Sequence, residues 1–121
     1  MRLAADITII LVALLHAGFL VLEMFLWDKP LGRKTFRMTP EHAAATKTLA
    51  ANQGLYNGFL AAGLIWGLSM GPAGRAVQLF FLGCVVVAGA YGAATVSRKI
   101  FWVQAMPAIV AGALLLWAAR G

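Results

Sequence analysis

Residues 7–27, ITIILVALLHAGFLVLEMFLW, form a run of 21 residues in which Glu23 is the only acidic or basic side chain apart from His16. As an α-helix this run would be about 30 Å long, which matches the hydrocarbon core of a bilayer. A carboxylate at that depth is costly and usually belongs to a functional site. The run therefore predicts a membrane-spanning helix, with Glu23 as the first candidate functional residue.

The composition of the whole chain indicates the same class of protein. Of its 121 residues, 62% are hydrophobic and 12% are charged, as is typical of an integral membrane protein. Three further apolar runs follow the first, joined by short connections. We therefore expect an all-α integral membrane four-helix bundle that forms a single domain over residues 1–121, with spans at about residues 6–27, 48–70, 76–96 and 100–119.

The basic residues predict the orientation of this bundle. Seven lie in the first and third connections and three on the other side. Because basic loops stay in the cytoplasm, both termini are expected outside, in a multi-pass protein of the bacterial cytoplasmic (inner) membrane. The net charge of +6 then reflects topology and contact with membrane lipids, so no nucleic acid partner is expected. The seven are Lys29, Arg33, Lys34, Arg37, Lys47, Arg98 and Lys99, and the three are Arg2, Arg75 and Arg120.

Local signals predict where the helices begin and bend. Residues 28–38 are polar and contain Pro30 and Gly32, which favours a loop. Thr39 and Pro40 then predict the start of a long helix over residues 40–70, whose first ten residues would extend into the cytoplasm. Pro107 predicts a mild kink in the last helix, because it leaves the carbonyl of Val103 without its usual donor.

Polar side chains from all four expected spans fall at the cytoplasmic level of the bundle. We expect Glu23 and Tyr91 to be the acid/base or hydrogen-bonding centre, three amides to orient a ligand, and two basic residues to attract an anionic group. The expected ligand-binding residues are Glu23, Asn52, Gln53, Asn57, Tyr91, Arg98, Lys99 and Trp102. No group of residues has the spacing of a metal site, and the sequence leaves the cofactor unknown.

Helical spacing groups some of these residues on shared faces. His16, Leu20, Glu23 and Trp27 form one stripe of the first helix, and Gln53, Tyr56 and Asn57 are expected to share a face of the second. Stripes of small residues predict close packing of helices in lipid, either within the chain or between copies of it in an oligomer. They are Gly54, Gly58 and Ala61 on the second helix, and Ala88, Gly92 and Thr95 on the third.

Three segments carry a resemblance to a known family. The strings LEMFLW (residues 22–27), ANQGLYNGFLA (residues 51–61) and GAYG (residues 89–92) are similar to a widespread family of small four-span bacterial membrane proteins of unknown function. The resemblance covers nearly the whole chain. It implies the four-span fold and no particular activity.

The layout also resembles, more distantly, the MAPEG superfamily of trimeric membrane enzymes. Residues 47–66, with Asn52 ahead of the string FLAA, are similar to the second-helix motif of that superfamily. The resemblance implies that Tyr91 and Arg98 could stand for third-helix elements that bind glutathione between subunits. It is an analogy of architecture.

Three functions remain open from the sequence. The first is a small inner-membrane protein, expected to be a homodimer or homotrimer, which binds or chemically modifies an amphipathic small molecule in a polar pocket at the cytoplasmic leaflet. The second is a scaffold, in which Glu23 pairs with Arg98 or Lys99 to fix helix register or to bind a partner. The third is a proton-coupled transporter that uses Glu23. Whether the protein is an enzyme stays undecided.

Overall fold

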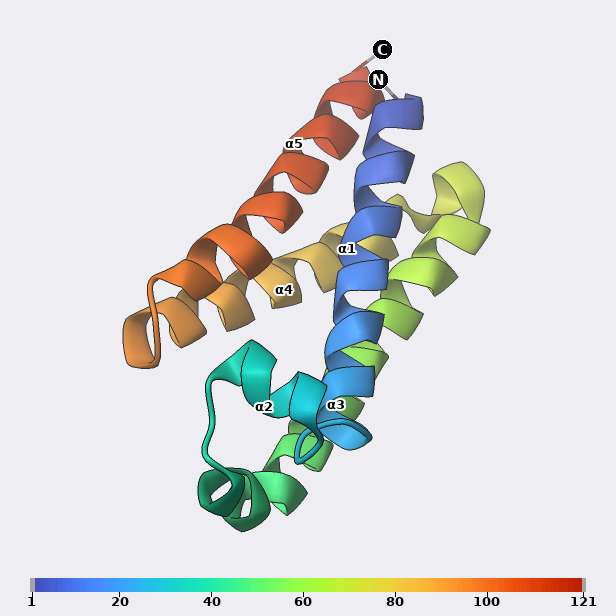
Figure 1. The fold of residues 1–121 in the computed structure, drawn as a ribbon. Coiled ribbons are helices and arrows are strands. Elements are labelled where there is room, and N and C mark those ends of the chain that lie inside the picture. The colour runs from blue at the N-terminus through green and yellow to red at the C-terminus, as the bar shows by residue number, and fades with distance from the viewer. Residues whose placement is uncertain (1, 121) are drawn as a thin grey trace. The chain divides into compact units, whose positions relative to one another are not determined.

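The computed structural model describes residues 2–120, and every regular element in that range is a helix, which confirms the expected all-α class. Figure 1 shows the order of these helices along the chain. They are α1 (Arg2–Met24), α2 (Pro30–Phe36), α3 (Pro40–Ser69), the 3₁₀-helix η1 (Gly71–Gly74), α4 (Arg75–Thr95), the π-helix η2 (Phe101–Ala105) and α5 (Met106–Arg120). The bounds of α3 confirm the long helix that Thr39 and Pro40 predict.

The chain folds as two compact units. One comprises residues 14–61, and the other comprises the residues up to 13 together with those from 62 onward. α1 and α3 each contribute to both units, whereas α2 belongs to the first, and α4, η2 and α5 belong to the second.

In the unit of residues 14–61, small residues of α3 allow α1 to approach closely. A side chain added at Gly54 would lie 2.8 Å from Cγ of Met24, 3.0 Å from Cβ of Glu23 and 3.2 Å from the carbonyl oxygen of Leu20. Gly58 faces the Leu20 side chain in the same way. The close packing that the small residues predict is therefore confirmed for Gly54 and Gly58.

The segment after α1 corrects two expectations. The helix ends at Met24 and not at Trp27, because the chain turns there and the N–H of Leu26 donates to the carbonyl of Val21, five residues back. The expected loop over residues 28–38 contains α2, since Pro30 stands at its first position, where a missing N–H costs nothing.

Gly32 lets this short helix pack closely against the turn before it. It is buried, and a Cβ at this position would collide with the backbone carbonyls of Leu26 and Trp27. The glycine therefore serves as a point of close approach between α2 and the turn before it, and does not act as a helix breaker. α2 ends at Phe36, and the next residue, Arg37, caps it in the left-handed conformation (φ 53°), with its N–H donating to the carbonyl oxygens of Arg33 and Lys34.

In the second unit, α4 packs against η2 and α5. Gly89 is buried, and a Cβ there would lie 2.7 Å from the backbone nitrogen of Ala105, so the two backbones nearly touch. Gly92 packs against Ile100, as a small residue at that position predicts. Ala88 and Thr95 are exposed and do not pack within this unit. Their expected use as a contact between copies of the chain stays a prediction.

Pro107 coincides with a local change of helix type. The N–H of Met106 donates to the carbonyl of Phe101, five residues earlier, which makes residues 101–105 a π-turn. Such turns accommodate one residue more than an α-helix would. The π-turn lies directly before Pro107, and the kink expected at the proline stays a prediction.

Among residues 2–120, three helical segments are long and apolar enough to cross a membrane: Arg2–Met24, Gly71–Thr95 and Phe101–Arg120. These correspond to the first, third and fourth expected spans. The second expected span coincides with the latter part of α3, whose amides lower its hydropathy. The structure thus has the helices of a membrane protein.

Candidate functional site

Glu23 and two amides of α3 form a hydrogen-bonded cluster within residues 14–61. Nδ2 of Asn57 donates to Oε1 of Glu23 across 2.6 Å, and Nε2 of Gln53 donates to Oε2 across 2.9 Å. Glu23 is only 4% exposed and Asn57 9% exposed. The three residues that the sequence places on facing helices therefore meet, with one amide on each carboxylate oxygen.

The position of Glu23 in α1 explains why it needs these donors. It is the second-to-last residue of the helix, where unpaired backbone carbonyls carry partial negative charge and disfavour a carboxylate. Hydrogen bonds from amides to a charged acceptor are stronger than those between neutral groups. Gln53 and Asn57 are four residues apart, so both point to the same side of α3 and supply these bonds together.

The cluster has more acceptors than donors. A carboxylate offers about four lone-pair positions, of which the two amides use one on each oxygen, and each amide keeps its own carbonyl oxygen. Within residues 14–61, all of which the structure describes, no lysine or arginine forms an ion pair with Glu23. The arrangement therefore suits a group that donates hydrogen bonds or carries positive charge.

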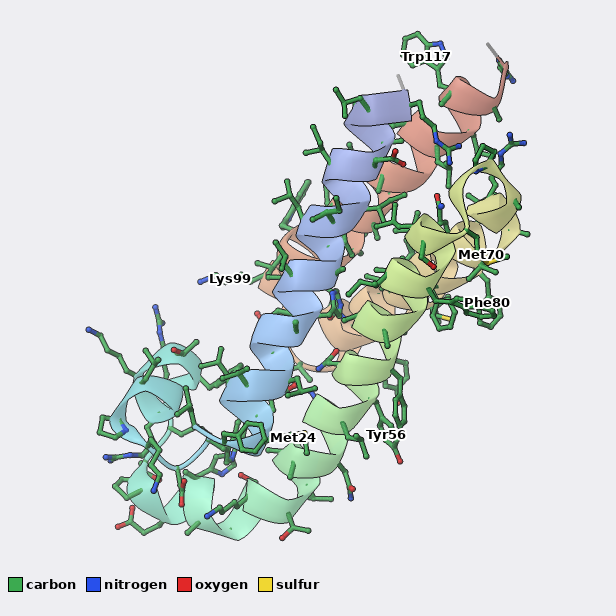
Figure 2. The ribbon with its side chains drawn as sticks, turned by 90° about the vertical axis from the view of Figure 1, so that its right-hand side faces the viewer. Met24, Tyr56, Met70, Phe80, Lys99 and Trp117 are labelled. Carbon is green, nitrogen blue, oxygen red and sulfur yellow. The ribbon has the colours of Figure 1, made fainter. Side chains whose placement is uncertain are left out.

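Three neighbours that the sequence predicts near Glu23 do not join this cluster. Figure 2 shows Tyr56 pointing outward from α3, away from Met24 at the end of α1, and its side chain is 61% exposed. Tyr56 is therefore not buried with Asn57, although its spacing of three residues from Gln53 predicts a shared side of the helix. Asn52 is exposed, and the hydrogen bonds to Glu23 come from Gln53 and Asn57. Trp27 lies beyond the end of α1.

Trp27 instead belongs to a second set of contacts in the same unit. Its Nε1 donates to Oγ1 of Thr46 across 3.0 Å, and its ring lies 4.9 Å from that of Phe36. Beside it, Nζ of Lys47 lies 3.0 Å from Oδ2 of Asp28. The hydrogen bond from Lys47 lowers the pKa of Asp28 below its ordinary value. These contacts fix the segment between α1 and α3. The spacing of the residues in the sequence did not predict them.

The other predicted site residues lie in the second unit. Tyr91 is on α4 and 72% exposed, Trp102 is in η2 and also exposed, and Arg98 and Lys99 are exposed in the connection between them. Their expected part in the site stays a prediction.

Sequence reasoning missed one buried polar residue of the second unit. Gln78 is fully buried on α4, and its Nε2 donates to the carbonyl oxygen of Gly67 across 2.9 Å. The bond occupies one of the last carbonyls of α3, which lack helical partners. The signal for this contact in the sequence is a glutamine placed about one helical turn after residues 71–74.

These features define the class of the protein: an all-helical chain with three membrane-length apolar helices and a buried carboxylate held by amides. The chain belongs to the family described as "Protein of unknown function (DUF1304)", whose model matches residues 10–116. The predicted resemblance to a family of unknown function is thereby confirmed, and the likeness to the MAPEG superfamily stays a prediction.

One curated relative shares most of the chain. The chain is 30% identical over 113 residues to the uncharacterized protein YpaA of Lactococcus lactis subsp. lactis (strain IL1403), and the alignment covers 92% of this chain and 95% of that protein. No solved structure matches the chain.

Proposed function

We propose that the chain is a multi-pass protein of the bacterial inner membrane that binds an amphipathic ligand through the Glu23 cluster. The ligand's polar head would contact Glu23, Gln53 and Asn57, while its apolar tail would lie among the lipid-facing helices. The observation that carries the proposal is the buried carboxylate that two neutral amides hold and no lysine or arginine of its own unit neutralises.

The proposal includes a fourth pass through the membrane, formed by α3. Its low hydropathy comes from side chains such as Gln53 and Asn57, and these are the groups that bond to Glu23. Polar groups that pair with each other cost less in a bilayer than free ones. The basic residues support an orientation with both termini outside and the start of α3 in the cytoplasm.

The free hydrogen-bond acceptors of the Glu23 cluster favour a ligand whose head group donates hydrogen bonds. A protonated amine has several N–H donors, which match the free lone pairs of Glu23 and the amide carbonyls of Gln53 and Asn57. Tyr91, Arg98, Lys99 and Trp102 remain part of the proposal as further contributors, in the MAPEG-like layout and in a homodimer or homotrimer.

Native mass spectrometry in a mild detergent tests the proposal. The purified wild type is expected to carry a defined small molecule, which Glu23→Gln and Asn57→Ala lose. Asn52→Ala is the matched control, since it removes an exposed amide of the same helix and should keep the molecule. A bare wild-type protein, or equal retention by Glu23→Gln, would exclude this function.

A structural role is the second candidate, and one observation favours it. Both oxygens of Glu23 already accept hydrogen bonds from α3, so the cluster could serve only to hold α1 against α3. On this hypothesis Glu23→Gln lowers stability and changes no bound molecule. Thermal unfolding measured beside the mass spectra separates the two candidates.

A further inference from the structure

A basic surface follows directly after the first membrane-length helix. We define the basic α2 surface as Lys29, Arg33, Lys34 and Arg37, together with the exposed apolar side chain of Leu31. All of these residues lie within 13 positions of Met24, where α1 ends. If α1 spans the bilayer, the surface stands at the height of the lipid head groups.

The positive charge of this surface is not neutralised by the protein. Between residues 28 and 47 the chain has five basic and two acidic side chains, Asp28 and Glu41. Asp28 pairs with Lys47. In the part of the chain that the structure describes, the four cations of the basic α2 surface form no ion pair, and Nε of Arg33 is buried without a hydrogen-bond partner. Four cations are thus left for an external anion.

The surface is held in a fixed place beside the end of α1. Because Gly32 has no side chain, α2 packs directly against the backbone of Leu26 and Trp27. The rings of Trp27 and Phe36 also contact each other. On the outer side, Leu31 is 56% exposed and precedes Lys34 by three positions, so an apolar and a basic side chain share one face. This combination is typical of segments that lie on a membrane surface.

Arg37 adds an independent argument. It adopts a left-handed backbone conformation (φ 53°), which glycine tolerates and other residues adopt at a cost. Glycine is the common residue at such a helix end. An arginine at this position therefore lowers the stability of the fold, but it places a cation on the surface three residues after Lys34.

We propose that the basic α2 surface binds the head groups of anionic phospholipids in the leaflet that borders the end of α1. The guanidinium and ammonium groups would contact lipid phosphates, and Leu31 would enter the acyl boundary. Each Lys or Arg near an anionic membrane surface strengthens binding by roughly five-fold. The proposal does not depend on a ligand at Glu23.

The test uses the full-length protein in mild detergent, mixed with phosphatidylglycerol and phosphatidylcholine of identical acyl chains. Both lipids carry a phosphate, and only phosphatidylglycerol is anionic. Native mass spectrometry should show wild type retaining phosphatidylglycerol in preference. The triple variant Lys29→Gln, Lys34→Gln, Arg37→Gln changes exposed residues only. It should lower that preference roughly a hundred-fold, since each of the three cations contributes a factor of about five.

Two single variants keep the proposal falsifiable if the triple variant folds poorly. Lys34→Gln should lower the preference roughly five-fold, whereas Arg120→Gln, the same change of charge at the other end of the chain, should leave it unchanged. Leu31→Gln keeps every charge and should weaken retention of both lipids alike. An unchanged preference in Lys34→Gln, or an equal loss in Arg120→Gln, would overturn the proposal.

Discussion

Nδ2 of Asn57 lies 2.6 Å from Oε1 of Glu23, although 34 residues separate the two in the sequence. The bond joins the last turn of α1 to the middle of α3, and it pairs a carboxylate with a neutral amide. No lysine or arginine of residues 14–61 forms an ion pair with this carboxylate. This distinguishes Glu23 from Asp28, which pairs with Lys47.

Variants that exchange the carboxylate of Glu23 and the amide of Asn57 test whether stability depends on the hydrogen bond itself or on which helix carries the carboxylate. Asn57→Asp places a second carboxylate against Glu23, and we expect it to lower the free energy of unfolding by about 1–3 kcal/mol. Adding Glu23→Gln restores one amide and one carboxylate and should recover most of that loss. Thermal unfolding of the single and double variants in detergent measures both effects.

The same exchange bears on ligand binding. A ligand that recognises the carboxylate at Glu23 should still be lost from the double variant, because the charge has moved to α3. If stability does not recover in the double variant, the contact between the two side chains is not the one described here.

Gly54→Leu should destabilise the unit of residues 14–61 by about 1–3 kcal/mol, the usual cost of overpacking. The added side chain would meet Met24, Glu23 and the carbonyl of Leu20. Gly18→Leu is the matched control, since nothing apart from its chain neighbours and the adjacent backbone of its own helix lies within 4 Å of the position of its Cβ. Equal effects of the two substitutions in thermal unfolding would contradict the close approach at Gly54.

The pair of Asp28 and Lys47 predicts a dependence of stability on pH. Because the folded state lowers the pKa of Asp28, the pair stabilises the fold above the ordinary pKa of an aspartate. This contribution is lost as the pH falls through the lowered, folded-state pKa. Unfolding curves between about pH 7 and pH 3 should therefore show a loss of stability that is smaller in Lys47→Gln. Curves that run parallel in both proteins would count against the pair.

Arg37→Gly should raise stability and weaken lipid binding together. Relief of the left-handed conformation is expected to add about 1 kcal/mol to the free energy of unfolding. Loss of the cation should lower the preference for phosphatidylglycerol roughly five-fold. Arg37→Ala keeps the backbone strain, so it should lower the lipid preference without the gain in stability. A stabilised Arg37→Ala would show that backbone strain is not the cause.

The helices and the centre of the site were accessible from the sequence because both rest on local spacing. Pro40 marks the start of α3, and Gln53 and Asn57, four residues apart, must share a face. Glu23 was conspicuous because it is the only carboxylate in an apolar run.

The features that spacing did not predict depend on which part of the chain packs against which. Pro30 and Gly32 look like loop residues, yet Pro30 begins α2 and Gly32 admits the backbone of Leu26. On α4, Gly89 meets Ala105 and sets the packing face within the unit, whereas Ala88 and Thr95 are exposed. Spacing identifies candidate faces, and the partner helix decides which one is used.

The π-turn of residues 101–105 also has a consequence for comparing sequences within the family. A π-turn corresponds to a single inserted residue in an α-helix, and here it lies just before Pro107, which cannot donate a backbone hydrogen bond. We expect relatives without a proline at this position to have one residue fewer between the positions of Ile100 and Met106. Alignments of the family should then show a one-residue gap at this site. The π-turn would mark the position at which one residue was inserted into the helix.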